Sequence, residues 1–229
     1  MIVAVHQPNY APWLGYFYKM AHCDIFVFLD DAQYSRGSYT NRVRIGRIGK
    51  AVWLTQPIKR DFGATIYDTR FSEDDWPNRH LDTLRGSYRQ AAAFDETWPM
   101  INDIWRNTPC QSLAAANCYI VKALACAIGL KPKFLAASTL VTEGTVGDAR
   151  LAQIMRAVAP DGGTYLSGEG GSKYQSSETF ATAGYELRYT EFRHPAYLRG
   201  DDPFVSGLSM LDALFHGGVE KTRHLLSVS

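Results

Sequence analysis

The sequence contains no apolar stretch long enough to cross a membrane. A spanning helix requires about 18 consecutive apolar residues, and polar, charged or proline residues interrupt each apolar run well before that length. The N-terminal segment passes from a short apolar run directly into prolines and polar groups, without the basic start and small-residue cleavage site of a secretory signal. We therefore expect no membrane span and a cytoplasmic location.

Cysteine is scarce, and its positions form no metal or disulfide pattern. No two cysteines make a CxxC pair, and three of the four fall in or beside one predicted helix, which holds its side chains at fixed spacings; the four are Cys23, Cys110, Cys118 and Cys126. Without an export signal, this usage favours reduced thiols.

The usual cofactor motifs are missing as well. The chain has no HExxH or paired-cysteine zinc spacing, no GxxxxGK[ST] loop, no GxGxxG fingerprint and no GxSxG elbow. We therefore assign no zinc, haem, P-loop nucleotide or NAD site, and the cofactor is left open.

Net charge is nearly absent. The chain carries 24 basic and 23 acidic residues, for a formal charge of +1, so no global field would attract nucleic acid. We expect a small-molecule partner and no nucleic-acid partner. Aromatic residues make up 13% of the chain and include 13 tyrosines, which is compatible with a polar, ring-lined pocket as well as with ordinary packing.

The first thirty residues predict a strand, a helix and a second strand. IVAV (2–5) is a short apolar run ended by turn residues, residues 13–22 have helical spacing of Leu14 and Phe17, and DIFVFL (24–29) is rich in aromatic and β-branched residues. Such a βαβ unit implies a parallel pair joined by a right-handed crossover.

The rest of the chain continues this alternation. Strands are predicted at 51–56, 133–138, 164–167 and 185–190, with a short one possible at 65–71, and helices at 77–90, 97–107, 112–128, 147–158, 208–216 and 218–226. The pattern predicts the α/β class, with a mostly parallel Rossmann-like sheet flanked by helices. We expect one domain over residues 1–229, with a partly helical insertion around 60–110.

Polar side chains follow several of the predicted strands. Because ligands of open parallel sheets bind beyond the carboxyl ends of the strands, these side chains are the candidate site. They are His6, Gln7 and Tyr10 after the first strand, Asp30 and Gln33 after the second, Thr55 and Gln56 after the third, Ser167, Gly168, Lys173 and Tyr174 after the strand at 164–167, and His194 after the last.

Three of these residues are candidate catalytic groups. His6 can act as an acid or base near neutral pH, or it can simply hydrogen-bond across its own turn. Asp30 can orient His6 or the acceptor, bind a cation, or cap a turn. His194, in a second His-Pro segment, can meet the N-terminal loop in space, or lie in a surface turn.

Two segments are candidate anion sites. Arg42 and Arg44, next to Asn41, lie on one side of the chain if it is extended, and arginine forks suit carboxylate or phosphate; a solvated hairpin is the alternative. SGEGGSKY (167–174) is a glycine-rich loop between a strand and a helix, where Lys173 can pair with a phosphate or merely be exposed.

Four blocks of sequence resemble one known family. HQPNYAPWLGYFYKMAHCDIFVFLDDAQYSRGSYTNR (6–42) strongly resembles the opening of the WbqC-like family, and the similarity continues in WLTQPI (53–58), TYLSGEGGSKY (164–174) and FRHPAYLRGDDPFVSGLSMLDALFHGG (192–218). The resemblance covers essentially the whole chain.

The resemblance implies a bacterial protein associated with O-antigen, lipopolysaccharide and other surface-polysaccharide genes, or with secondary metabolism. It implies a transferase that moves an acyl or aminoacyl group to an amino group of a sugar or other small molecule, with a nucleotide-linked amino sugar or an acyl carrier as partner. It assigns no catalytic residue by itself. On this hypothesis His6 would be the general base, Asp30 would orient it, and Arg42 and the 167–173 loop would hold the anionic part.

Two alternatives remain open at this stage. One is a nucleotidyltransferase or ligase of the HIGH type, although the chain has WLGY (13–16) near the first turn and no HxGH. The other is a non-catalytic carbohydrate-binding or assembly protein, for which the aromatic surplus would suffice.

Overall fold

A five-stranded parallel sheet forms the centre of the fold. The computed structural model describes residues 1–47, 49–59, 61–140 and 144–227. The spatial order of the strands is β5-β2-β1-β6-β7, and they comprise β1 (Ile2–His6), β2 (Ile25–Phe28), β5 (Lys133–Ala136), β6 (Gly163–Ser167) and β7 (Tyr185–Tyr189). From β1 in the middle, the chain adds β2 and β5 on one side of the sheet, and then β6 and β7 on the other side. The predicted α/β class with a Rossmann-like parallel sheet is confirmed.

The first crossover is the predicted βαβ unit. Helix α1 (Leu14–Ala21) joins β1 to β2, and the two strands pair in parallel from Val3–Ile25 to His6–Phe28. The inward side chains of α1 include Leu14 and Phe17, at the helical spacing that the sequence predicts.

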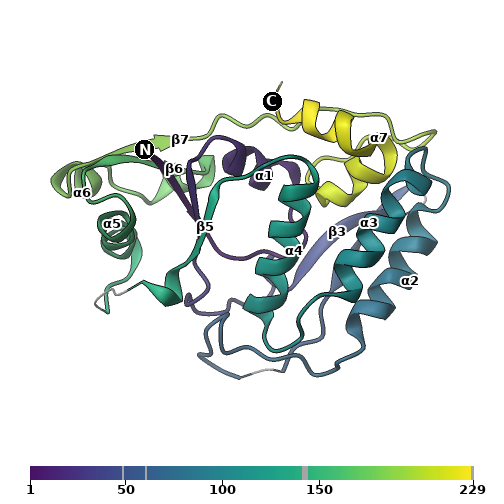
Figure 1. Cartoon of the computed structure of the whole chain (residues 1–229), viewed down its shortest axis with the longest axis horizontal. Coiled ribbons are helices and arrows are strands. Elements are labelled where there is room, and N and C mark those ends of the chain that lie inside the picture. Colours follow the sequence, from purple (N-terminus) through teal and green to yellow (C-terminus); the bar gives the residue numbers. More distant parts are fainter. Residues whose placement is uncertain (48, 60, 141–143, 228–229) are drawn as a thin grey trace.

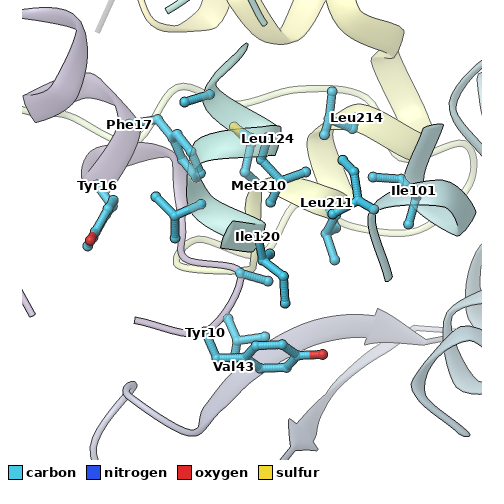
Figure 2. Close-up of a cluster of buried hydrophobic side chains, with 14 of the residues drawn as sticks. Tyr10, Tyr16, Phe17, Val43, Ile101, Ile120, Leu124, Met210, Leu211 and Leu214 are labelled. Carbon is cyan, nitrogen blue, oxygen red and sulfur yellow. The ribbon is translucent and has the colours of Figure 1, made fainter. Parts of the chain in front are cut away.

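Helices cover both faces of the sheet. Because successive strand side chains point to opposite faces, Ala4 packs into one buried cluster while Val3 and Val5 pack into the other. The cluster around Ala4 includes side chains of α1, of α4 (Leu113–Ala127) and of α7 (Met210–Leu225), and Figure 2 shows several of them meeting. The second face is covered by α5 (Gly147–Val158) and α6 (Ser177–Thr182), on the opposite side of the sheet in Figure 1.

The chain between β2 and β5 carries the insertion. It contains an antiparallel pair, β3 (Arg42–Arg47) with β4 (Lys50–Thr55), followed by α2 (Trp76–Tyr88) and α3 (Phe94–Arg106). The strand predicted at 51–56 therefore exists, but the expectation that Thr55 and Gln56 follow a strand of the main sheet is wrong. Gly49, with φ of 70°, lies in the tight turn that folds β4 back on β3.

The strand considered at 65–71 is absent from the described residues of that segment. Its backbone makes only isolated bridges, between Gln33 and Thr65 and between Ile58 and Phe71. Such single bridges bind the loop to its neighbours without building a ladder.

The two terminal helices predicted from the sequence form one interrupted element. Gly218, with φ of 75°, breaks the helical path inside α7. The carboxylate of Glu96 in α3 accepts a hydrogen bond from the backbone N–H of Val219 at 3.2 Å, which caps the restarted helix. Two 3₁₀ turns, Ala137–Thr139 and Glu169–Lys173, complete the regular structure of the described residues. None of the described helices combines the length and the apolar character needed to traverse a bilayer.

Candidate functional site

A cavity of about 770 Å³ opens where strands β1 and β6 diverge. The β1–β6 pairing ends at Ala4–Leu166, whereas the β1–β2 pairing continues to His6–Phe28. The chain order reverses between β1 and β6, and this switch point is where open α/β sheets bind ligands. The wall includes Val5, His6, Gln7, Trp13, Gly15, Tyr16, Lys19, Leu29, Gly147, Arg150, Leu151, Tyr165, Ser167, Gly168, Glu169, Gly170, Gly171, Tyr174, Gln175, Thr190 and Phe192.

His6 is a neutral hydrogen-bond acceptor in this wall. Its Nδ1 lies 3.0 Å from the carbonyl oxygen of Gln7, and since a carbonyl only accepts, Nδ1 carries the proton and Nε2 keeps its lone pair. The ring lies 4.6 Å from that of Tyr16 and 6.3 Å from that of Trp13, measured between centroids. Burial, together with the nearby charge of Lys19, lowers the pKa of His6 to about 3. The imidazole is therefore uncharged at neutral pH, with a proton on Nδ1 alone.

This low basicity bears on the role predicted for His6. A general base works best when its pKa lies near the operating pH, and an imidazole with a pKa of about 3 holds a proton only weakly. The imidazole of His6 can still accept a hydrogen bond through Nε2.

Lys19 is a wall residue that the sequence reasoning missed. Its side chain is only 4% exposed, and Nζ donates a hydrogen bond of 2.9 Å to the carbonyl oxygen of Val5. Burial lowers the pKa of Lys19 to about 7. The available clue was its position three residues after Tyr16 and one before Met20, on the inward side of a predicted amphipathic helix.

A polar cluster forms the β6 side of the cavity. The Nε2 atom of Gln175 donates a hydrogen bond of 3.5 Å to the hydroxyl of Tyr165, and burial raises the pKa of that phenol to about 12. Within the described part of the chain, the buried Oε1 atom of Gln175 has no hydrogen-bond partner. Ser167 and Gly171 complete the cluster. Gly171 packs closely against the other two residues, so that a Cβ atom at Gly171 would collide with Oε1 of Gln175 and Oγ of Ser167.

Charged groups in the wall are few and of both signs. Arg150 of α5 forms an ion pair with Asp31, the residue after Asp30 at the end of β2. Glu169 supplies a carboxylate near the glycine-rich loop. The cavity wall thus presents more apolar than polar surface, includes several aromatic side chains, and is not strongly basic.

The structure brings five of the sequence-predicted residues together in the cavity wall. They come from two strands and the segments after them, and are His6, Gln7, Ser167, Gly168 and Tyr174. Their roles remain predictions.

Asp30 lies outside the cavity wall. Its two carboxylate oxygens accept hydrogen bonds from the backbone N–H of Ser138 at 2.9 Å and from the hydroxyl of Ser138 at 2.6 Å. The side chain therefore caps the turn that follows β5, in agreement with the alternative that Asp30 is a turn cap.

Tyr10 is also turned away from the cavity, into the insertion. Its hydroxyl donates to Nδ1 of His80 at 2.6 Å and accepts from Nε1 of Trp105 at 3.0 Å. Nε2 of His80 in turn donates to the carbonyl oxygen of Thr55 at 3.1 Å. Burial lowers the pKa of His80 to about 4, so this chain of hydrogen bonds joins a neutral imidazole to two aromatic residues.

The segment at 41–44 lies on the hairpin beside the cavity. Asn41 is buried and donates to the carbonyl oxygen of Gln56 at 3.1 Å. The guanidinium of Arg42 stacks on the ring of Trp53 at 4.2 Å from its centroid and donates to the carbonyl oxygen of Gly37 at 2.6 Å. Arg44, on the same strand, is half-buried.

A row of aromatic rings links this hairpin to the cavity. Trp13, in the cavity wall, lies 5.3 Å from Tyr39, and Tyr39 lies 5.8 Å from Trp53, measured between ring centroids. Tyr39 and Trp53 are 39% and 47% exposed. The planes of neighbouring rings are tilted by 56° and 50°, so the row continues from the cavity wall as a stepped, partly exposed apolar surface.

The remaining candidates lie apart from the wall. Gln33 is exposed and bridges Thr65, and Lys173 is exposed at the end of the 3₁₀ turn. His194 packs 5.5 Å from the wall residue Phe192, between ring centroids, and burial lowers its pKa. Among the described side chains, no three His, Cys, Asp or Glu residues gather closely enough to hold a metal ion.

The fold is that of an α/β protein with a cavity at the switch point of its parallel sheet. The model of the WbqC-like protein family matches residues 7–224, so the chain belongs to this family, and the resemblance drawn from the motifs is confirmed. The chain is also 30% identical over 230 residues to the uncharacterized protein Rv1507c of Mycobacterium tuberculosis (strain ATCC 25618 / H37Rv), covering 97% of this chain and 96% of that protein. No solved structure matches the chain.

Proposed function

We propose that this WbqC-like protein is a transferase that joins an acyl or aminoacyl group to an amino group of a sugar or another small molecule. The observation that supports the proposal is the cavity of about 770 Å³ at the switch point, with the neutral imidazole of His6 in its wall. Its size suits a small-molecule ligand.

His6 would orient the attacking group. Its Nε2 lone pair accepts a hydrogen bond from the amine, which then attacks the acyl carbon. A C–N bond forms, the bond between the acyl carbon and the leaving group breaks, and the leaving group takes up the proton that the nitrogen loses. The side chains of Ser167 and Gln175 also line the cavity and would donate hydrogen bonds to the acyl oxygen. Positioning of this kind contributes through orientation and preorganised polar groups.

The aromatic row would receive the rest of the acceptor. Trp13, Tyr39 and Trp53 present successive rings that lead from the cavity to Arg42. Ring faces stack well on sugars and bases, and a guanidinium suits a phosphate. A nucleotide-linked amino sugar would place its amine in the cavity and its anionic part near the hairpin, in cytoplasmic surface-polysaccharide or secondary-metabolite synthesis.

Mass spectrometry can test this proposal directly. Purified protein is incubated with nucleoside-diphosphate amino sugars and with acyl or aminoacyl donors, and the amide product is measured. We expect turnover, and His6→Ala is expected to lower kcat/KM about tenfold or more, on the order of one lost hydrogen bond to the substrate.

His22→Ala is the matched control. His22 is exposed at the end of α1, where its Nδ1 lies 2.8 Å from the carbonyl oxygen of Tyr18, so its loss should leave turnover unchanged. Full activity of a folded His6→Ala protein would remove His6 from the reaction. Absence of any amide product across the panel would count against the transferase itself.

The strand order supports one second candidate, a nucleotidyltransferase or ligase. The order β5-β2-β1-β6-β7 has the same reversal beside the first strand as dinucleotide-binding folds. Calorimetric titration with ATP and with CTP would favour this candidate if either binds, and indifference to both would exclude it.

A further inference from the structure

The amine of Lys19 occupies the crevice between the ends of β1 and β6. Adjacent carbonyls of a strand point to opposite edges, and the carbonyl of His6 accepts from Leu29, beyond β2, so that of Val5 points toward β6. There the ladder has already ended, at Ala4–Leu166. Nζ of Lys19 reaches this free carbonyl from α1, at 2.9 Å.

The surroundings of Lys19 favour a neutral amine. Its side chain is almost fully buried, and within the described residues no carboxylate lies close enough to form an ion pair with it. Removing a charged ammonium from water without a counter-ion favours loss of its proton. The lowered pKa of Lys19, about 7, agrees with this geometry.

The position of Lys19 also gives the amine a place to react. Lys19 lines the cavity together with His6 and Tyr16, so a small molecule bound there lies beside Nζ. A desolvated, unprotonated lysine amine is the usual nucleophile toward carbonyl carbon in proteins.

We propose that Lys19 is a covalent binding site for the aldehyde or keto group of a small molecule held in this cavity. Nζ attacks the carbonyl carbon, and the former carbonyl oxygen leaves as water after taking up both amine hydrogens. The product is a neutral imine that hydrolysis reverses. Ser167 and Gln175 lie across the cavity and can hold the polar groups of the bound carbonyl compound.

The test traps the imine in the whole, folded protein. Protein at pH 7 is incubated with glyoxylate and sodium cyanoborohydride, which reduces an imine to a stable secondary amine, and modified peptides are quantified by mass spectrometry. We expect Lys19 to be modified at least tenfold faster than Lys122. That lysine of α4 lies over the rings of Phe28 and Phe134, at 5.6 and 5.8 Å, and serves as internal reference.

The pH dependence of trapping supplies a second measurement on the same protein. The rate at Lys19 should reach half its maximum near pH 7, whereas an ordinary lysine would still be gaining reactivity at pH 10. Equal rates at Lys19 and Lys122, or a midpoint at Lys19 near the ordinary lysine value, would overturn the proposal. Because neither variant proteins nor the transferase substrates are needed, this failure would leave the proposed transfer reaction untouched.

A variant of Lys19 identifies which lysine forms the imine, in addition to the two measurements on the wild-type protein. Lys19→Arg keeps a cation at the position but forms no imine, and it should abolish fast trapping while Lys122 is modified as before. Persistent fast modification elsewhere in the Lys19→Arg protein would show that the reactive amine is another lysine.

Discussion

Arg199 and Asp212 form a two-point ion pair in the interior of the protein. Nε of Arg199 donates to Oδ2 of Asp212 at 2.8 Å and Nη2 donates to Oδ1 at 3.2 Å, with side-chain exposures of 1% and 0%. Tyr88 and Tyr197 donate to the same carboxylate, at 3.0 and 2.8 Å. The pair therefore fastens the segment after β7, which supplies the cavity wall residue Phe192, to helix α7.

Removal of one partner of this pair should be strongly destabilising. Arg199→Met leaves Asp212 buried with an uncompensated charge, and we expect a loss of about 3–5 kcal/mol in the free energy of unfolding. Urea denaturation followed by circular dichroism measures it.

The exposed pair Arg188–Glu186 is the matched control. Its side chains are 57% and 54% exposed, and Arg188→Met should leave the free energy of unfolding nearly unchanged because water screens the pair. Similar losses for Arg199→Met and Arg188→Met would contradict the importance of burial.

The hydroxyl of Tyr10 is expected to stabilise the insertion rather than bind ligand. Tyr10→Phe leaves Nδ1 of His80 and Nε1 of Trp105 without their shared partner, which should cost about 1–3 kcal/mol. Thermal or urea unfolding gives the stability, and ligand affinity measured in parallel should stay unchanged. A selective loss of affinity at full stability would restore Tyr10 to the binding site.

Two of the three glycines in the 167–174 loop should respond differently to replacement by alanine. A Cβ at Gly171 meets Ser167 and Gln175, whereas a Cβ at Gly168 meets nothing within 4 Å. Gly171→Ala should therefore destabilise the protein by about 1–3 kcal/mol through overpacking. Gly168→Ala should fold normally and can weaken binding only by narrowing the cavity. Equal unfolding midpoints for the two variants would argue against the close packing at Gly171.

The burial of Lys19 predicts a pH-dependent stability. Its pKa is about 7 in the folded protein and 10.5 in the reference state, so between these values the unfolded chain binds more protons. Stability should consequently rise as the pH increases from about 7 toward 10.5, at up to about 1.4 kcal/mol per pH unit.

Lys19→Met isolates this contribution from other titrating groups. The variant should be more stable than the wild-type protein at pH 7, and the difference should shrink by pH 9.5, as measured by urea denaturation at both values. A difference that does not change with pH would mean that Lys19 keeps its proton in the fold.

Local sequence patterns were enough to predict most of the helices and strands and to place part of the cavity wall. The apolar run at 2–5 and the turn residues after it identify β1 and place His6 and Gln7 at its end, and the same logic places Ser167 and Gly168 at the end of β6. That these two strands are neighbours follows from long-range packing, which periodicity does not report. The general rule that ligands of parallel sheets bind beyond the strand ends is what grouped these residues into one candidate site.

Two further features depend on tertiary context that the local sequence does not report. Asp30 ends a strand, but β2 lies between β1 and β5, away from the switch point, and Ser138 takes up its carboxylate. Lys19 escaped notice because charged helix residues normally face water. Because the β1–β6 pairing ends at Ala4, the carbonyl oxygen of Val5 is left to accept a hydrogen bond from the amine of Lys19.

The break at Gly218 ties the end of the chain to a residue more than a hundred positions earlier. The restarted helix obtains its first hydrogen-bond acceptor from Glu96 of α3, across 123 residues of sequence. Without that carboxylate, the last turns would lose their cap. The backbone amides after Gly218 should thus exchange their hydrogens in step with the opening of α3, which makes the two helices a single unit of local unfolding.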